Sequence, residues 1–253
     1  MINMIDAKEA FNEFVNNYDV GNSKIKLKCF HTIRVSEICN SLAKSLGLSE
    51  KEKDLAELIG LLHDIARFEQ IKIYDSFDDR YTIDHGNLGV TILSDDNKIR
   101  SFIKTNKYDE IIIKAVFAHN KAFIPDDYTE EEKLYAKILR DADKIDILYM
   151  MAANEVKYNF SEEAISLQTV ESILNSKFIN YFDVKTTLDK LLLNLAFIND
   201  LNFPYNYEII KKENYINTII DSLELKENDS IEIFKEVKMF LNKELNEKSK
   251  GVI

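Results

Sequence analysis

Apolar residues recur every three or four positions along almost the whole chain, with charged residues between them. This spacing places the apolar side chains on one face of an α-helix, which is typical of helices that pack on a shared core. The pattern therefore predicts an all-α protein. The predicted helices span Asp6–Asn17, Lys24–Leu46, Glu50–Phe68, His85–Leu93, Tyr108–Asn120, Glu130–Met151, Glu162–Asn175, Val184–Asn199, Tyr207–Leu223 and Asp229–Lys248.

Residues that mark turns and helix ends are sparse. Only six glycines and two prolines occur in the 253 residues, which favours long helices over a sandwich of many short strands. Gly47, Ser49 and Glu52 predict the end of one helix and a capping box at the start of the next. The segments Gln70–Asp84 and Asn120–Tyr128 lack helical spacing. We expect the first to be an ordered loop beside the functional site and the second to be a break between helices.

No repeat, low-complexity tract or Pro/Gly/Ser-rich linker divides the sequence. We therefore expect one all-α domain, a helical bundle over residues 1–253. The chemistry is expected in residues from about 20 to 150, and residues from about 151 to 253 are expected to form a helical extension packed on that core.

The composition is that of a globular protein, with 45% hydrophobic and 30% charged residues. Acidic residues outnumber basic ones by 44 to 33, giving a net charge of −11. Such a surface repels phosphate backbones, which makes bulk nucleic acid a poor partner. A small anionic substrate is still compatible, because a bound metal ion can outweigh the surface field locally.

Features that would place the protein in a membrane or an oxidising compartment are absent from the sequence. The first residues include early acidic side chains and no apolar stretch of a secretory signal, and no apolar run reaches the roughly 18 residues of a membrane span. Cys29 and Cys39 match neither a disulfide framework nor a zinc knuckle, so we expect ordinary thiols in a reducing compartment. The expected location is the cytoplasm, with no membrane partner.

The strongest chemical signal is the position of the histidines. The chain has four, His31, His63, His85 and His119, and each lies in a predicted helix, as does Asp143. Apolar residues three, four, seven or eight positions away place all five side chains on apolar faces. Hydrogen-bonded core histidines, with a salt bridge from Arg140 to Asp143, are the structural explanation for any one of them. That explanation becomes strained when every histidine in the chain needs its own version.

A divalent cation would account for all of these positions together. Burying an ionised carboxylate costs several kcal/mol unless it is paired or bound to a metal. Imidazole and carboxylate groups suit Fe, Mn, Co, Ni or Zn, and helices of a bundle can project such ligands to one point. With Asp64, which follows His63 directly, there are six candidate ligands, which suit two octahedral ions that share a bridging carboxylate.

The order of these residues resembles the HD-domain superfamily of metal-dependent phosphohydrolases. His31-Thr-Ile-Arg-Val resembles its first-histidine helix, and Leu61-Leu-His-Asp-Ile-Ala-Arg-Phe-Glu resembles its defining His-Asp doublet. Asp84-His-Gly-Asn-Leu-Gly and Ala118-His-Asn resemble the two further histidine segments of dinuclear members. Leu139-Arg-Asp-Ala-Asp-Lys-Ile-Asp resembles the terminal aspartate helix. A His-Asp pair alone is weak, whereas five elements in the right order are a specific signal over about residues 22–150.

The resemblance implies an all-helical fold and a set of metal ligands. It assigns one ion to His31, His63, Asp64 and Asp143. It assigns a second ion to His85 and His119, with Asp64 as the bridging and catalytic carboxylate. Asp143 is preferred to Asp141 because the family's last ligand usually precedes a basic and an aliphatic residue, as Lys144 and Ile145 do here. Asp141 stays as the alternative.

One position departs from the pattern of some nucleotidase members, which carry an acidic residue four positions after the doublet histidine. Here that residue is Arg67. Its planar guanidinium could hold a substrate phosphate, and the alternative is a salt bridge with Asp75, Asp78 or Asp79. Lys144 is a second candidate for substrate binding, and Arg34 is a weaker one.

These observations predict a metal-dependent phosphohydrolase that uses a metal-activated water on a nucleotide or a similar small phosphorylated molecule. The cofactor would be one or two divalent ions, Fe, Mn, Ni, Co, Zn or Mg, which the ligand set does not distinguish. The same resemblance leaves two alternatives open. One is a di-iron oxygenase of the HD type, and the other is a non-catalytic regulator that binds a nucleotide or a metal. The sequence does not indicate an oligomeric state.

Overall fold

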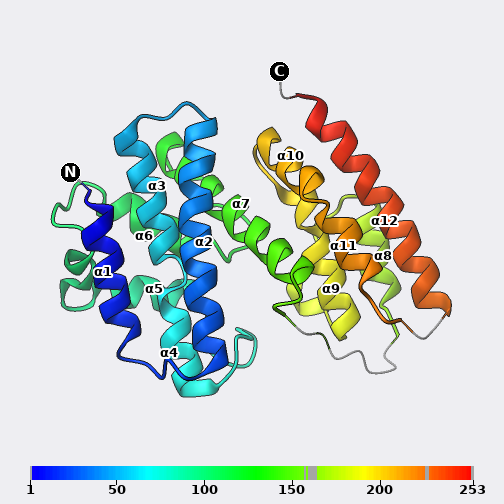
Figure 1. The fold of residues 1–253 in the computed structure, drawn as a ribbon, viewed down its shortest axis with the longest axis horizontal. Coiled ribbons are helices and arrows are strands. Elements are labelled where there is room, and N and C mark those ends of the chain that lie inside the picture. The colour runs from blue at the N-terminus through cyan, green and yellow to red at the C-terminus, as the bar shows by residue number, and fades with distance from the viewer. Residues whose placement is uncertain (1, 157, 159–163, 226–227, 252–253) are drawn as a thin grey trace. The chain divides into compact units, whose positions relative to one another are not determined.

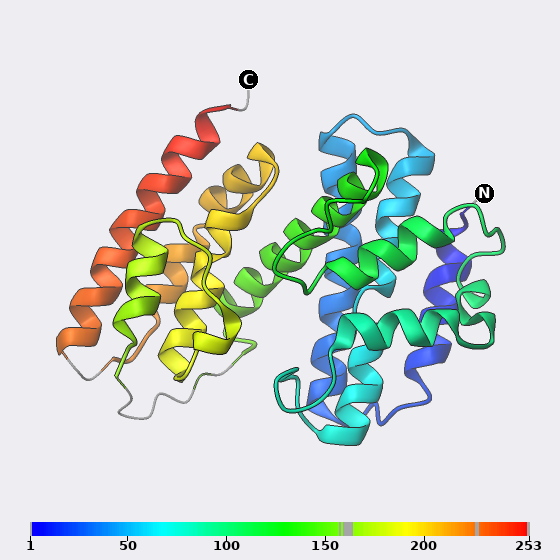
Figure 2. The ribbon, with the colours of Figure 1, turned by 180° about the vertical axis from the view of Figure 1, so that it is seen from behind.

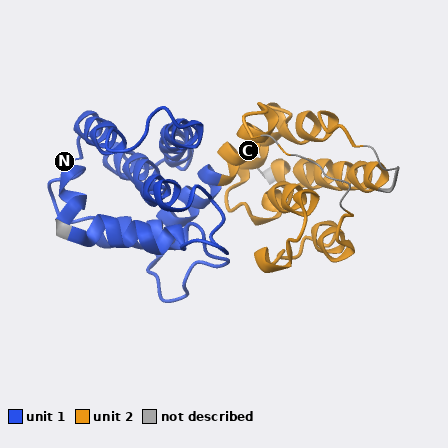
Figure 3. Ribbon diagram, turned by 90° about the horizontal axis from the view of Figure 1, so that it is seen from below, with its two compact units in different colours: residues 1–143 blue, residues 144–253 orange. Residues whose placement is uncertain are grey.

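The structure, a computed structural model, describes residues 2–156, 158, 164–225 and 228–251, and every regular element in these residues is a helix (Figure 1). The predicted all-α fold class is confirmed. The chain divides into two compact units, residues 1–143 and 144–253 (Figure 3), and each is described by itself. The expectation of one domain over the whole chain stays a prediction.

The first unit begins with α1 and ends within α7. Helices α2 and α3 lie side by side in both views of the ribbon (Figure 1 and Figure 2). Further along the chain, α4 packs on α5, and α5 packs on α6. The elements are α1 (Met4–Val15), α2 (Ser23–Ser45), α3 (Glu50–Leu62), α4 (Ile65–Tyr74), α5 (His85–Ser94), the 3-10 helix η1 (Asp95–Ser101), α6 (Asp109–Ala118) and α7 (Glu130–Ala152).

The close approach of α2 and α3 depends on a glycine. A Cβ atom at Gly60 would lie 2.7 Å from Cα of Ser36 and 3.0 Å from Sγ of Cys39. The turn between the two helices has the predicted end signals: Gly47 has a φ of 74°, and the carboxylate of Glu52 accepts from the backbone N–H of Ser49 at 2.7 Å. The short turn and the small residue bring the middle of α2 against the end of α3.

One predicted helix is two helices, which corrects the expectation of a continuous helix over Glu50–Phe68. Helix α3 ends at Leu62, His63 keeps helical dihedrals, and Asp64 leaves the helical region with φ −104° and ψ 20° before α4 begins. No glycine or proline lies between 61 and 66, so the apolar spacing continues across a break that local sequence does not signal.

Helix α4 also extends to Tyr74, so 70–74 of the expected loop are helical and the loop covers 75–84.

The second unit consists of shorter helices with α12 packed along α8, α10 and α11. Asn214 has a φ of 55° and separates α10 from α11, which corrects the single helix expected over Tyr207–Leu223. The helix expected over Val184–Asn199 is a shorter α9 followed by a 3-10 helix, and the expected start at Glu162 lies outside the described residues. The elements are α8 (Leu167–Leu174), η2 (Tyr181–Asp183), α9 (Thr187–Leu195), η3 (Ala196–Asp200), α10 (Pro204–Lys212), α11 (Tyr215–Asp221), α12 (Asn228–Lys248) and η4 (Ser249–Gly251).

Candidate metal centre

The six candidate ligands come together inside the first unit, although they lie on different elements. His31 and His63 are fully buried, and His85, His119 and Asp64 are nearly so. The side chain of Asp143 is 19% exposed. The elements that carry them are α2 (His31), the α3–α4 junction (His63 and Asp64), the first residue of α5 (His85), the residue after α6 (His119) and α7 (Asp143).

Four of these side chains form a first group. Nε2 of His31 lies 3.2 Å from Oδ1 of Asp143, 3.3 Å from Nε2 of His63 and 3.4 Å from Oδ2 of Asp64. Nε2 of His63 lies 3.4 Å from Oδ2 of Asp64 and 3.9 Å from Oδ1 of Asp143. Ligands that bind one ion at about 2.1 Å lie roughly 3.0–3.4 Å from each other. The spacing of His31, His63 and Asp64 therefore fits a single cation, and Asp143 lies beside the two histidines of this group.

The second group shares Asp64 with the first. Oδ1 of Asp64 lies 3.6 Å from Nε2 of His85 and 3.7 Å from Nε2 of His119, and these two nitrogens are 2.9 Å apart. The two oxygens of one carboxylate thus face different groups, Oδ2 the first and Oδ1 the second. These positions would allow the carboxylate to bridge two cations.

Hydrogen bonds on the far side of three imidazoles set which nitrogen is available to a metal. Nδ1 of His63 lies 2.7 Å from the carbonyl oxygen of Gly60, and Nδ1 of His119 lies 2.6 Å from that of Val116. Nδ1 of His85 lies 2.5 Å from a carboxylate oxygen of Asp79. Carbonyl and carboxylate oxygens only accept, so Nδ1 carries the proton and Nε2 keeps its lone pair. The Nε2 atoms facing each other form a donor set that fits a divalent ion.

The ionisation states agree with this donor set. Burial lowers the pKa of His63, and burial together with the charge of Arg67 lowers the pKa of His85 to about 3. Both are neutral at neutral pH, which is the form that binds a metal. Burial opposes ionisation of Asp64, yet the charge of Lys28 holds the pKa of this carboxyl well below its usual range. Burial also opposes ionisation of Asp143, and its hydrogen bond with His31 holds that pKa low.

Lys28 is a member of the site that the sequence does not single out. Its Nζ atom lies 2.5 Å from Oδ2 of Asp64, and its side chain is 13% exposed. Lys28 precedes His31 by three positions on the same helix, so the two side chains share a helix face, but this spacing is common and does not by itself indicate a site. Its ammonium group also lies 5.4 Å from the ring centre of Phe77 in the loop after α4.

Arg67 is held by the loop that follows α4. Its Nη1 atom donates to Oε1 of Gln70 at 2.6 Å, to the backbone oxygen of Phe77 at 2.8 Å and to Oδ1 of Asp79 at 3.0 Å. The salt bridge considered as the alternative role is thus present, with Asp79. Nε of Arg67 also lies 3.5 Å from Oδ1 of Asp64. A role in substrate binding stays a prediction for this residue.

The remaining candidates differ in their surroundings. Lys144 is buried in the second unit, where Nζ donates to the backbone oxygen of Asp200 at 2.7 Å and pairs with its carboxylate. The pairing with Asp200 does not test the predicted contact of Lys144 with substrate, which stays a prediction. The predicted substrate contact of Arg34 also stays a prediction. Asp141 is fully buried on α7, but the distances above place Asp143 against His31 and His63, which favours Asp143 as the ligand.

Arg140 has a structural role near one of the ligands. Nη1 donates to the backbone oxygen of Ala118 at 3.1 Å and also binds that of Lys121, while Nη2 donates to that of Ala122 at 3.3 Å. These carbonyl groups lie at and just after the end of α6, where backbone N–H groups of the helix are no longer available as hydrogen-bond donors. Arg140 thereby ties the segment around His119 to α7.

Comparison with known proteins gives one match. Residues 30–148 match the family model described as HD domain, and this range contains all six candidate ligands. No curated protein and no solved structure matches the chain. Among the described residues, no helix has the length and apolar character needed to cross a membrane.

Proposed function

We propose that the protein is a metal-dependent phosphohydrolase that acts on small phosphorylated molecules, because residues 30–148 match the HD domain family. The observation that carries the proposal is the position of Asp64. Its two carboxylate oxygens each face a separate pair of imidazoles at 3.4–3.7 Å. Two cations bridged by one carboxylate are a recurrent arrangement in enzymes that transfer phosphoryl groups.

His31, His63 and Asp64 would hold the first ion together with Asp143, which lies against both histidines, and Asp64, His85 and His119 would hold the second. Divalent ions at these positions would supply a water of lowered pKa and neutralise charge on a phosphoryl group. The first group offers four donors and the second offers three, so the second leaves more coordination positions for water and substrate. In this account Asp64 would hold both ions and would help to orient the attacking water.

The cationic side chains beside Asp64 support an anionic substrate. Lys28 and Arg67 place positive charge 2.5 Å and 3.5 Å from the two oxygens of this carboxylate. These two charges offset part of the negative charge of Asp64, Asp79 and Asp143, and bound divalent ions would make the site positive, whereas the protein as a whole carries a net charge of −11. A negative surface with a site made positive by bound ions favours a small phosphate ester or anhydride, such as a nucleotide, over a polynucleotide.

Phosphate release tests the proposal directly. The wild-type protein is assayed with nitrophenyl phosphate, bis-nitrophenyl phosphate and a panel of nucleotides, with Mn, Co, Ni or Mg supplied in turn. We expect turnover with at least one pair of substrate and metal, and a loss of about 1,000-fold or more in His63→Ala and Asp64→Ala, since these variants lose a metal ligand. Asp109→Asn, which alters an ion pair with Arg100 outside the centre, is the control.

Three results would contradict the proposal. Unchanged turnover in correctly folded His63→Ala and Asp64→Ala variants would exclude this centre as the origin of the activity. Oxygen consumption by iron-loaded protein without phosphate release would indicate an oxygenase. Tight nucleotide binding without turnover under any metal would indicate a regulator.

A further inference from the structure

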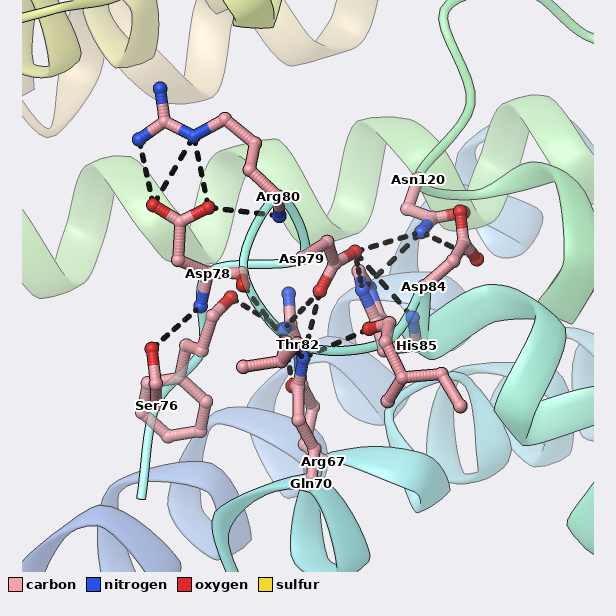
Figure 4. A network of polar contacts seen from close by, with 12 residues as sticks. Arg67, Gln70, Ser76, Asp78, Asp79, Arg80, Thr82, Asp84, His85 and Asn120 are labelled. Carbon is pink, nitrogen blue, oxygen red and sulfur yellow. Dashed lines mark hydrogen bonds and ion pairs between the residues drawn. The ribbon is translucent and has the colours of Figure 1, made fainter. Parts of the chain in front are cut away.

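His85 differs from the other two histidines whose Nδ1 contacts are described above. His63 and His119 contact the carbonyl oxygens of Gly60 and Val116, each three residues earlier in the helix that leads to it. These contacts are provided by regular helical structure. Nδ1 of His85 instead contacts Asp79, a side chain on the loop 75–84 (Figure 4). The orientation of His85 therefore depends on a loop residue.

Asp79 is surrounded by hydrogen-bond donors. Its Oδ1 atom accepts from Nη1 of Arg67 at 3.0 Å and from Nε2 of Gln70 at 2.9 Å. Its Oδ2 atom accepts from Nδ1 of His85 at 2.5 Å and from Nδ2 of Asn120 at 3.2 Å. Burial opposes ionisation, but the hydrogen bond with His85 and the charge of Arg67 hold the pKa of Asp79 well below its usual range. A carboxylate satisfies these four contacts, and a longer one of 3.5 Å from the backbone N–H of His85, because both of its oxygens accept.

The groups around Asp79 are themselves fixed. Gln70 is fully buried, and its Nε2 atom also donates to Oγ1 of Thr82 at 2.8 Å and to the backbone oxygen of Ile83 at 3.1 Å. A Cβ atom at Gly86 would lie 2.4 Å from Oδ1 of Asn120, so the glycine makes room for that amide. The amide of Gln70 thus has little freedom to exchange its donor for its acceptor, because both of its ends have partners.

We propose that Asp79 is a positioning residue that keeps the Nε2 lone pair of His85 available and thereby controls binding of the second metal ion. The inference rests on the proposed function, because it assumes that the second group is a metal site. It predicts that the loop affects the second ion and leaves the first ion unaffected.

The substitution Asp79→Asn tests this through the proton on His85. Arg67 can only donate, and the contacts of Arg67 and Gln70 with Oδ1, at 3.0 and 2.9 Å, are shorter than those of Asn120 and the backbone N–H of His85 with Oδ2, at 3.2 and 3.5 Å. The oxygen of the introduced amide would therefore stay against Arg67 and Gln70, and its NH₂ group would face the ring of His85. His85 would then accept at Nδ1 and carry its proton on Nε2, which cannot bind a metal. The tautomer is read by NMR on metal-free protein labelled with ¹⁵N-histidine, and His85→Gln assigns the signal among four histidines. We expect the Nδ1–H form in wild type and the Nε2–H form in Asp79→Asn.

Binding of Mn²⁺, measured by isothermal titration calorimetry on the full chain, is the second readout. We expect wild type to bind two ions and Asp79→Asn to bind the second ion about 10- to 100-fold more weakly, with the first ion unchanged. Asp78→Asn is the matched control, because Asp78 lies on the same loop and pairs with Arg80 at 2.7 Å. It should bind both ions as wild type does.

A second variant keeps the test decisive if Asp79→Asn does not fold. Asp79→Ser removes the fixed acceptor, and we expect a mixture of His85 tautomers with a weakened second ion. The inference is overturned if wild type binds one ion, or if the folded variants keep the wild-type tautomer and bind the second ion with wild-type affinity. If the inference fails in one of these ways but the wild-type protein still releases phosphate, the proposed function stands. If the wild-type protein binds no Mn²⁺ at all, both the inference and the proposed function are contradicted.

Discussion

At the scale of single residues, Asp64 has the most unusual surroundings in the first unit. It is a carboxylate with 2% of its surface exposed, and Lys28 provides its closest positive charge at 2.5 Å. An ion pair of this kind has to offset the cost of removing both charges from water. A metal ion bound to Asp64 would supply positive charge at the same carboxylate. Lys28 should therefore matter most when the centre is empty.

The substitution Lys28→Met should lower the free energy of unfolding more in metal-free protein than in metal-loaded protein. Without metal we expect a loss of roughly 3–5 kcal/mol, the cost of leaving a buried charge without its partner. With Mn²⁺ bound the loss should be clearly smaller. Urea unfolding in EDTA and in Mn²⁺ measures both values.

Lys24→Met is the control for this prediction, because Lys24 pairs with an exposed partner, Asp75, which is 73% exposed. A surface pair of this kind contributes about 0–1 kcal/mol. An equal loss for Lys28→Met in EDTA and in Mn²⁺ would show that Lys28 and the metal do not act on the same carboxylate.

The sequence predicts the ligands better than their neighbours. The histidines and Asp143 are recognisable because polar groups on apolar helix faces need a partner. Lys28 shares a helix face with His31, but a lysine three positions from a histidine is common and carries no signal by itself. Asp79 lies six positions before His85, and its contact with that ring depends on the path of the loop 75–84. Contacts of this kind come from tertiary structure.

At the scale of elements, the junction between α3 and α4 determines the geometry of the centre. Asp64 has dihedrals outside the helical region, and the chain resumes a helix at Ile65. The sequence predicts one helix through this point, because apolar spacing continues and no glycine or proline interrupts it. Asp64 makes tertiary contacts with Lys28 and the histidines, and these contacts outweigh its local preference for a helical conformation. A spacing pattern reports only the local preference, so it does not show this break. By contrast, the turn at Gly47 is predictable because its residues have direct conformational requirements.

The packing of α2 on α3 gives a prediction at this scale. In Gly60→Ala, the new Cβ atom would lie 2.7 Å from the backbone Cα of Ser36, so the two helices must separate. We expect unfolding to require about 1–3 kcal/mol less free energy, which is usual for overpacking. Because His31 lies on α2 and His63 follows α3, the first Mn²⁺ ion should also bind more weakly.

Urea unfolding and Mn²⁺ titration measure the two effects of Gly60→Ala. Gly89→Ala is the graded control, since its Cβ atom would meet the Cγ1 atom of the Val116 side chain at 3.0 Å, and a side chain can shift more easily than a backbone. Wild-type stability and wild-type Mn²⁺ affinity in Gly60→Ala would contradict this account of the packing.

At the scale of the whole molecule, the chemistry is confined to one part of the chain. All six candidate ligands lie within residues 1–143, and the HD domain match ends at residue 148. The sequence predicts this confinement, because all four histidines precede residue 120. It does not predict a substrate, since specificity would come from loops and from the helices after α7, where no motif with a known chemical meaning occurs. Any part of the second unit in selecting substrates is therefore a matter for experiment.

Anomalous diffraction from crystals grown with Mn²⁺, collected at the manganese absorption edge, tests the central claim most directly. The account predicts one peak bound by His31, His63, Asp64 and Asp143, and a second peak bound by Asp64, His85 and His119. Anomalous peaks only at other positions, or no peak within bonding distance of either oxygen of Asp64, would contradict it.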